Sequence, residues 1–398
     1  MFPFARKNKP ASTCIPLAGA YFPRLNNPEK IMANPLISKS PGLAKVKSIV
    51  AVSSCKGGVG KSTTAINLAF SLAAAGKRVG IFDADIYGPS MPTMIHLENL
   101  ELFREDDLIS PAMYEGVKLM SFGWIPTKTG EAGPAIMRGP MATQIINELL
   151  TGTNWGELDH LIIDFPPGTG DIQLTLCQLV SLTAAVIVTT PQQLSFVDVV
   201  KGIQMFEKLK VPTINVVENM SYYACGKCGE KAYIFGQGAR QKLIDQFGFK
   251  NTCEIPVHPD LSRYGDTGRP FVLEQPDHEL TKRYAALAVE VDRELELIHS
   301  ESVGRPTLTY NVGQEMILTL PDGTEHEFSP AALRRTCRCA QCVEEFTGAA
   351  KIVPEDIPED IYPTQITPMG NYAVAVKWST MDCGSIFPFE RIVADLVK

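Results

Sequence analysis

The stretch "SSCKGGVGKSTT", residues 53–64, places three glycines and two lysines between an apolar run and an alanine-rich helical pattern. The apolar run before it, "SIVAVSS" at 48–54, is typical of a buried strand. A strand, a glycine-rich turn and a helix together form the arrangement in which backbone N–H groups and a helix N-terminus bind phosphate. The stretch therefore predicts a phosphate loop for a nucleotide.

Each residue type in this loop has a physical role. Gly57, Gly58 and Gly60 permit a tight turn that approaches the phosphates closely, Lys61 reaches the terminal phosphates, and Ser62 ligates Mg²⁺. The predicted nucleotide-binding residues of the loop are Lys56, Gly57, Gly58, Val59, Gly60, Lys61, Ser62 and Thr63.

The loop departs from the ordinary phosphate-loop pattern at one position. The pattern GxxxxGK[ST] requires glycine at position 55, where this chain has Cys55. The sequence is instead KGGVGKST, with Lys56 as an additional lysine.

Apolar runs and helical patterns alternate from residue 47 onward. The runs at 78–85, 160–167, 184–191 and 212–220 are nearly continuous in apolar residues, which is typical of parallel strands covered on both faces. We predict an α/β fold with a mostly parallel, doubly wound sheet. A hairpin pattern with a turn at Asp322 and Gly323 then indicates a separate, small β-rich α+β domain.

These patterns divide the chain into four parts: a leader expected to be disordered at 1–43, the α/β domain at 44–301, a linker at 302–306 and the small domain at 307–398. Prolines in the leader would interrupt the amphipathic helix of an organelle transit peptide. We therefore expect a cytoplasmic protein, with the plastid stroma or mitochondrial matrix as the alternative if residues 1–31 are a transit peptide.

Composition excludes several classes of function. The chain of 398 residues is 45% hydrophobic and 20% charged, and its net charge of −7 argues against a nucleic-acid-binding surface. No apolar stretch is long enough to cross a bilayer, so we expect a soluble protein without a membrane partner. Ten cysteines without a secretory signal indicate a reducing compartment, where clustered cysteines more often bind metal than form disulfides.

Polar residues follow several of the predicted strands. Asp83 and Asp85 stand in "DADIYGPS", Asp164 in "IIDFPPGTGD" and Asn219 in "VENMS". Ligands of open α/β sheets bind at the carboxyl ends of the strands, so these residues are candidates for the nucleotide and its Mg²⁺. The alternatives are a helix cap for each aspartate and an ordinary turn residue for Asn219.

A C-x-x-C pair follows the last of these strands. Cys225 and Cys228 lie on a glycine-flanked turn, where two thiolates can point at one metal but fill only half of a tetrahedral site. A second chain would supply the other two thiolates at a two-fold axis, and Cys₄ ligation suits either Zn²⁺ or a [4Fe–4S] cluster. Redox-active thiols and a structural zinc pair are the competing interpretations.

Several motifs together resemble a known family. KGGVGKST resembles the deviant phosphate loop of MinD and ParA, and with "MRGPM" (137–141), "WGELDHLIIDFPPGTGD" (155–171), "VENMS" and "CGKCG" the chain resembles the Mrp/ApbC-type iron–sulfur cluster carriers over roughly residues 44 to 300. The resemblance implies a homodimer that sandwiches two ATP molecules, with Lys56 reaching the nucleotide of the other subunit. It also implies that Asp85 orients the attacking water, that Asp83 and Asp164 belong to the Mg²⁺ shell, and that Asn219 contacts adenine.

The small domain carries a second cysteine cluster. Cys337, Cys339 and Cys342 have C-x-C-x-x-C spacing, which favours metal binding. With "GNYAVAVKWS" the region resembles the N-terminal domain of γ-butyrobetaine hydroxylases and the same module in the plant plastid Mrp-type scaffold. A histidine completes the zinc site in the hydroxylases, but the stretch 377–385 contains none, so Cys383 or, less favourably, Asp382 is expected to supply the fourth ligand.

The function predicted from all these motifs is ATP-dependent transfer of a [4Fe–4S] cluster, held at a dimer interface, to apo iron–sulfur proteins, with ATP hydrolysis. Two alternatives use the same fold: a MinD- or ParA-like positioning ATPase, and an electron-transfer protein like the nitrogenase iron protein. The first needs a membrane-seeking helix or a basic DNA-binding face, and the second does not use an adjacent C-x-x-C pair.

Overall fold

The fold is described from a computed structural model of the chain. It describes residues 40–54, 56–98, 100, 102–105, 108–125, 139–168, 171–247, 249, 251–300, 306–310, 315–339, 341–344, 349–369, 373–381, 383 and 385–396. Most of the predicted leader, the linker residues 302–305, Cys55 and Asp382 lie outside these residues.

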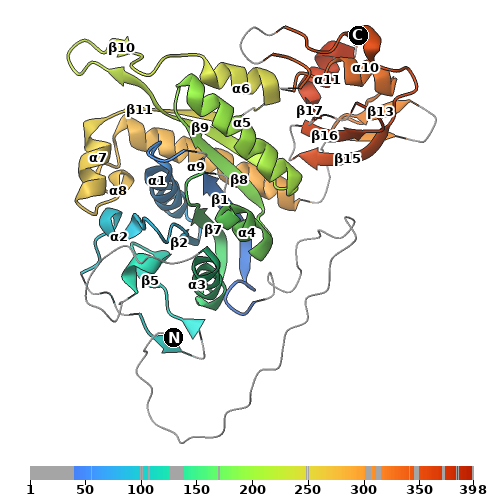
Figure 1. Cartoon of the computed structure of the whole chain (residues 1–398). Coiled ribbons are helices and arrows are strands. Elements are labelled where there is room, and N and C mark those ends of the chain that lie inside the picture. Colours follow the sequence, from blue (N-terminus) through green and yellow to red (C-terminus); the bar gives the residue numbers. More distant parts are fainter. Residues whose placement is uncertain are drawn as a thin grey trace, which may run out of the picture.

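A nine-stranded, mostly parallel sheet forms the centre of the larger domain, as the sequence predicts (Figure 1). Its order is β10-β9-β8-β1-β7-β2-β6-β5, with β11 alongside β9. Only β5 and β10 pair antiparallel with their neighbours. The strands are β1 Val46–Ser53, β2 Val79–Asp83, β5 Ala112–Tyr114, β6 Val117–Ser121, β7 Leu158–Asp164, β8 Ala184–Thr189, β9 Thr213–Ala224, β10 Lys231–Ala232 and β11 Thr252–Val257.

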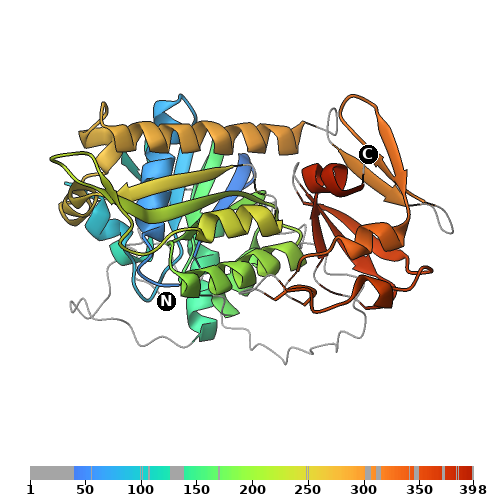
Figure 2. The same cartoon turned by 90° about the horizontal axis from the view of Figure 1, so that it is seen from above.

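Helices cover both faces of this sheet (Figure 2). Alternate residues of β1 show the reason, because Ile49 and Ala51 belong to one apolar core while Val50 and Val52 belong to the other. Helices α1 Lys61–Ala74, α8 Phe271–Glu274 and α9 Glu279–His299 pack on the second core. Helices α3 Gly139–Gly152, α4 Asp171–Leu179, α5 Gln193–Lys208 and α6 Ala239–Phe247 pack on the first.

The larger domain also contains several shorter elements outside the central sheet. They are α2 Met91–Met94, the pair β3 Arg104–Glu105 and β4 Leu108–Ile109, the 3-10 turn η1 Phe122–Trp124, and α7 Pro259–Asp266. Among the helices that the structure describes, none has the length and apolar character needed to cross a membrane.

The small domain contains two three-stranded antiparallel sheets (Figure 1). The predicted turn at Asp322 and Gly323 joins β13 to β14. The elements are β12 Thr307–Tyr310, β13 Met316–Thr319, β14 Glu325–Phe328, α10 Pro330–Arg335, η2 Pro354–Asp356, β15 Pro363–Met369, β16 Ala373–Trp378, β17 Ser385–Pro388 and α11 Phe389–Leu396.

The two domains contact each other through apolar side chains. Met369 and Ala373 of the small domain are buried in the same core as helices α3 to α6 of the larger domain, and β17 contacts α6. The small domain therefore packs on the α5 and α6 side of the sheet rather than standing apart from it (Figures 1 and 2).

Candidate nucleotide site and cysteine centres

The phosphate loop connects β1 to α1 through two glycines with left-handed backbone. Gly58 has a φ of +77° and Gly60 a φ of +84°, values that side-chain-bearing residues rarely adopt. No side chain caps the N-terminus of α1, and its first turn holds no acidic residue. The N–H groups of that turn are suited to an anion, and the phosphate-binding role stays a prediction.

Asn219 supports this loop from the middle of β9, which continues to Ala224 and does not end at this residue as the sequence suggested. Its Nδ2 donates a hydrogen bond of 2.8 Å to the carbonyl of Val59. A Cβ added at Gly60 would lie 2.1 Å from the same nitrogen, so glycine is required there for space as well as for conformation. The contact gives Asn219 a role beneath the loop, and the predicted adenine contact stays a prediction.

Lys61 and Asp164 form a buried ion pair at the base of the loop. Their side chains are 7% and 4% exposed, and Lys61 Nζ also lies 3.2 Å from Ser62 Oγ. Burial raises the pKa of Asp164, while the Lys61 ammonium opposes that rise. The pair brings the predicted phosphate-binding lysine next to two of the three predicted Mg²⁺-binding side chains, those of Asp164 and Ser62.

Asp83 is occupied by contacts within the protein. One carboxylate oxygen accepts the N–H of Asp85 at 3.1 Å, and the other accepts the N–H groups of Ser90 and Met91 and the hydroxyl of Ser121 at 3.0 to 3.1 Å. Burial, followed by the nearby Asp164, raises the pKa of Asp83 to about 7. Because a carboxylate accepts about four hydrogen bonds, these contacts favour the capping alternative over a place in the Mg²⁺ shell.

Asp85 is more accessible than the other two aspartates. Its side chain is half-buried, and its Oδ1 accepts one hydrogen bond of 3.1 Å from the N–H of Gly88. Asp83 holds the backbone of Asp85 in place, so one carboxylate is buried and orders the loop while the other is only half-buried.

The C-x-x-C pair lies on the hairpin loop between β9 and β10. The turn is closed by hydrogen bonds from Cys225 N to Glu230 O and from Gly229 N to Cys225 O, of 2.9 and 2.8 Å. Cys225 is half-buried and Cys228 exposed. Backbone N–H groups of Lys227 and Cys228 lower the pKa of Cys225, which favours the thiolate that a metal requires.

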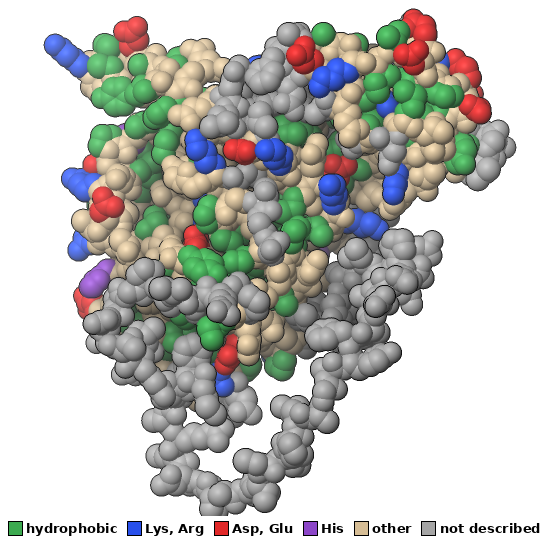
Figure 3. Space-filling model, viewed as in Figure 1, with side chains coloured by type: hydrophobic (Ala, Val, Ile, Leu, Met, Phe, Trp, Pro, Cys, Tyr) green, Lys and Arg blue, Asp and Glu red, His purple; other side chains and the backbone are tan. Residues whose placement is uncertain are grey.

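The hairpin projects from the body of the larger domain (Figure 1). Large apolar side chains are exposed beside the cysteines: Tyr223 at 37%, Tyr233 at 44% and Ile234 at 61%. Hydrophobic atoms gather at this projection in the space-filling view (Figure 3). An exposed apolar surface around two accessible thiols is typical of a contact site for another protein.

The part of β9 that connects Asn219 to the cysteine hairpin contains one residue with a strained backbone. Met220 follows Asn219 in β9 with a φ of +56°, which is unfavourable for a residue with a side chain. The pairing of β11 with β9 shifts in register nearby, between Ile255 and Val257. The strand therefore bends between the residue that supports the loop and the residues that carry the cysteines.

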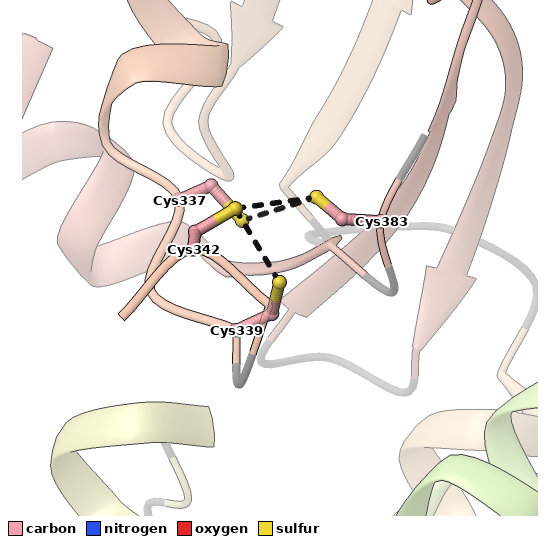
Figure 4. A group of neighbouring side chains, drawn as sticks. All are labelled: Cys337, Cys339, Cys342 and Cys383. Atoms are coloured by element: carbon pink, nitrogen blue, oxygen red, sulfur yellow. Dashed lines mark hydrogen bonds between the residues drawn. The ribbon is translucent and has the colours of Figure 1, made fainter. Parts of the chain in front are cut away.

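The four cysteines of the small domain come together (Figure 4). Cys337, Cys339 and Cys342 lie after α10, Cys383 lies before β17, and all four Sγ atoms are within 4.8 Å of one another. The separations from Cys383 to Cys337, from Cys383 to Cys342 and from Cys339 to Cys342 are 3.7, 3.6 and 3.6 Å. Zn–S bonds of about 2.3 Å in a tetrahedron place sulfurs roughly 3.8 Å apart.

This geometry fits one tetrahedral metal ion better than a cluster, whose four ligands each bind a different iron and must stand farther apart. Within the described residues this is the one group of three or more potential metal ligands. Cys225 and Cys228 therefore form no complete site within the described part of one chain. Of the four clustered residues, Cys339 is the most exposed, and its sulfur lies near Glu207 of α5. Burial, together with this sulfur, raises the pKa of Glu207 to about 7.

Sequence reasoning missed Arg334. This residue is 1% exposed and contacts the cluster. The basic pair in "LRRTCRC" was a visible signal, but the sequence alone does not distinguish the buried Arg334 from the half-buried Arg335.

A family model for the NUBPL iron-transfer P-loop NTPases matches residues 45–292. The chain belongs to that family. A second model, for the γ-butyrobetaine hydroxylase-like N-terminal region, matches residues 310–393 of this NUBPL-type NTPase. Both assignments agree with the resemblances drawn from the motifs.

Individual relatives of this NUBPL-type NTPase agree with the family models. The chain is 51% identical over 355 residues to the Fe-S cluster assembly factor HCF101, chloroplastic, of Oryza sativa subsp. japonica, covering 88% of this chain and 65% of the rice protein. It is 46% identical over 260 residues to the iron-sulfur cluster carrier protein of Escherichia coli strain K12, covering 65% of this chain and 70% of that protein. The chain thus spans just under two thirds of the rice relative's length.

A solved structure also matches. The nucleotide-binding protein of Archaeoglobus fulgidus, in complex with ADP, is 38% identical and aligns with a TM-score of 0.53 over 61% of this chain and 94% of its own. The P-loop NTPase fold predicted from the sequence is confirmed, and it supports ATPase activity for the larger domain.

Proposed function

We propose that the chain is an ATP-dependent carrier that holds a [4Fe–4S] cluster between two copies and transfers it to apo iron–sulfur proteins. The observation that carries the proposal is the pair of half-buried Cys225 and exposed Cys228 on a hairpin continuous with β9, the strand that also contains the Asn219 that supports the phosphate loop. The names of the relatives as cluster carriers and assembly factors support cluster transfer over a positioning role.

The homodimer supplies what one chain lacks. Two thiolates leave a metal site half filled, and a two-fold axis through the hairpin would add the second pair. The exposed Tyr223, Tyr233 and Ile234 beside the pair would be buried by the partner copy. The cluster is the cargo, so the ligands need to be accessible for exchange rather than enclosed.

The nucleotide is proposed to bind at the uncapped N-terminus of α1. Lys61 would exchange its ion pair with Asp164 for the terminal phosphates, which frees the carboxylate to help hold Mg²⁺ with Ser62. Mg²⁺ supplies charge neutralisation of the phosphates. Asp85 would orient the attacking water, and Lys56 would reach the nucleotide of the other subunit.

We propose structural zinc at the second centre, with Cys337, Cys339, Cys342 and Cys383 as the ligands. The separations between their sulfurs fit a closed tetrahedral site. Such a site contributes binding energy to the folding of the small domain.

The relatives' names bear on the compartment. The similar plant proteins are named chloroplastic, which supports the plastid alternative, whereas nothing in them supports the cytoplasmic prediction. We therefore propose a plastid location, to be checked by the position of a fluorescent fusion.

Replacing Cys225 or Cys228 by serine tests the carrier function. Each variant should fail to form the bridging cluster in iron and sulfide analysis after anaerobic reconstitution, while fluorescent ATP analogues bind as in the parent. Cys253→Ser is the matched control, since Cys253 lies in β11 away from the hairpin. A double variant that retains a full cluster would move the cluster site to the cysteines of the small domain and contradict the proposal.

A further inference from the structure

Arg334 is a buried charge inside the small domain. It stands near the end of α10 and is 1% exposed. Arginine is almost never fully buried without a partner of opposite charge, because removing a guanidinium from water is costly. Its surroundings should therefore contain the negative charge that it needs.

No carboxylate supplies that charge among the described residues. Arg334 Nη1 donates to Cys342 Sγ at 3.3 Å and Nη2 donates to the carbonyl of Met381 at 2.9 Å. Its Nε has no hydrogen-bond partner in the described structure, and no ion pair to Asp or Glu is found for it there. The ionisable groups that Arg334 meets are the sulfurs of the cysteine cluster.

The two contacts of Arg334 also join the two halves of that cluster. Cys342 belongs to the loop that carries Cys337 and Cys339, whereas Met381 precedes Cys383 in the turn before β17. Met381 has a φ of +49°, an unfavourable value for a side-chain-bearing residue, and the bond to its carbonyl helps to hold that turn. One guanidinium thus fixes a ligand on one segment and the backbone beside a ligand on the other.

We propose that Arg334 is the positioning and charge-compensating residue of a tetrathiolate metal centre. Four thiolates carry two more negative charges than one Zn²⁺ neutralises, and the buried guanidinium offsets one of them. The inference rests on the proposed zinc site and adds to it a residue outside the ligand set. Residues of this kind typically change metal affinity by about 10- to 100-fold when replaced.

The test uses three variants of the full chain in a Cys225→Ser/Cys228→Ser background, so that the hairpin contributes no metal. Arg334→Met keeps much of the volume without the charge, and Arg334→Lys keeps the charge. Arg335→Met is the matched control, because Arg335 is 31% exposed and contacts Glu359 and the carbonyl of Ile357 instead of a sulfur. Zinc affinity is measured by competition with a chromophoric chelator, and the thiolate-to-metal absorption is recorded after Co²⁺ substitution.

We expect Arg334→Met to weaken zinc binding by about 10- to 100-fold and to shift the Co²⁺ absorption, Arg334→Lys to recover part of both, and Arg335→Met to match the parent. Equal affinity in Arg334→Met and the parent, or better binding in Arg334→Met than in Arg334→Lys, would overturn the role of Arg334 alone. A parent that binds no zinc would overturn the metal centre itself. If Arg334→Met does not fold, Arg334→Gln replaces it, and binding no weaker than in Arg334→Lys would contradict the inference.

Discussion

Lys61 has a structural contact as well as a proposed binding role. Its ammonium neutralises Asp164 in a site that is almost closed to water. A buried carboxylate left without a partner is strongly unfavourable. On the proposed function, the terminal phosphates of the nucleotide would replace the carboxylate as the anionic partner of this lysine.

We expect Lys61→Ala to abolish nucleotide binding, because the main side-chain cation of the loop is lost. The variant should also unfold at a lower temperature, since Asp164 loses its ion-pair partner. Titration with a fluorescent ATP analogue and thermal unfolding measure the two effects. Binding at the parent's affinity would refute the assignment of the loop.

Lys56→Ala is expected to keep nucleotide binding and lose hydrolysis. Lys56 is half-buried in the loop, and its carbonyl accepts the Ser54 hydroxyl at 3.0 Å, so removing only its side chain leaves this loop contact in place. Phosphate release is the measurement. Normal turnover in this variant would contradict the two-subunit nucleotide site.

Substitutions at Gly60 and Gly58 distinguish the cost of a steric clash from the cost of backbone strain. Gly60→Ala would place a Cβ against Asn219 and also force a side chain into a left-handed conformation, which costs about 1–3 kcal/mol by itself. Gly58→Ala imposes similar strain with nothing within 4 Å of the new Cβ. We therefore expect Gly60→Ala to lower the free energy of unfolding more than Gly58→Ala does.

Asn219→Ala completes this comparison as a double-mutant cycle. Alone it removes the hydrogen bond to Val59, worth about 1 kcal/mol. Combined with Gly60→Ala it removes the steric clash, so the double variant should be more stable than the sum of the single losses predicts. Additive losses in denaturant unfolding would show that the clash is relieved in another way.

At the scale of elements, the sequence predicts the central sheet well and the contacts between distant segments poorly. Periodicity and strand-end motifs are local patterns, so β1, β2, β7, β8 and β9 were predictable together with the loop residues. The four acceptor contacts of Asp83 include Ser121, which lies far away in sequence. The burial of Arg334 depends in the same way on a turn near residue 381, which no local pattern encodes.

A buried histidine links β7 to α9. His160 is 1% exposed, and its Nε2 lies 3.0 Å from Asp292, which also pairs with Lys77 at 2.8 Å. Burial lowers the pKa of His160 below its usual value of 6.5, with Asp292 opposing the change and Lys77 adding to it. Below pH 6.5 the unfolded chain therefore takes up a proton at this ring more readily than the folded chain does.

The free energy of unfolding should decrease as the pH falls, because of this histidine. Because the folded pKa is lower than the unfolded one, the contribution of His160 is complete above pH 6.5 and is lost as the pH falls toward the folded pKa. His160→Gln should reduce the slope of unfolding free energy against pH below pH 6.5, as measured by denaturant unfolding at several pH values. Equal slopes in the parent and His160→Gln would contradict this prediction.

At the scale of the whole molecule, the two domains are joined through apolar contacts as well as through the chain. Met369 and Ala373 are buried in the core of the larger domain, so loss of order in the small domain would expose part of that core. The small domain has an apolar core of its own, and the cysteine cluster joins the segment after α10 to the connection between β16 and β17.

Removal of the zinc proposed at the four cysteines should therefore destabilise the small domain more than the larger domain. Chelation, or Cys383→Ala, is expected to make the region 307–398 sensitive to protease while the larger domain still binds nucleotide. Cleavage followed by mass spectrometry locates the affected region, and the same chelator with zinc in excess is the control. A small domain that resists protease without metal would instead support the cluster as an open docking point for cargo or a partner.

The bent strand β9 restricts how the chain can vary in length. Asn219 has to contact the phosphate loop, and Cys225 has to lie on the hairpin that follows β9. The number of residues between them fixes their relative positions. Because side chains alternate between faces, inserting one residue between them would turn the following segment to the opposite face. Insertions between Met220 and Ala224 should therefore be incompatible with function.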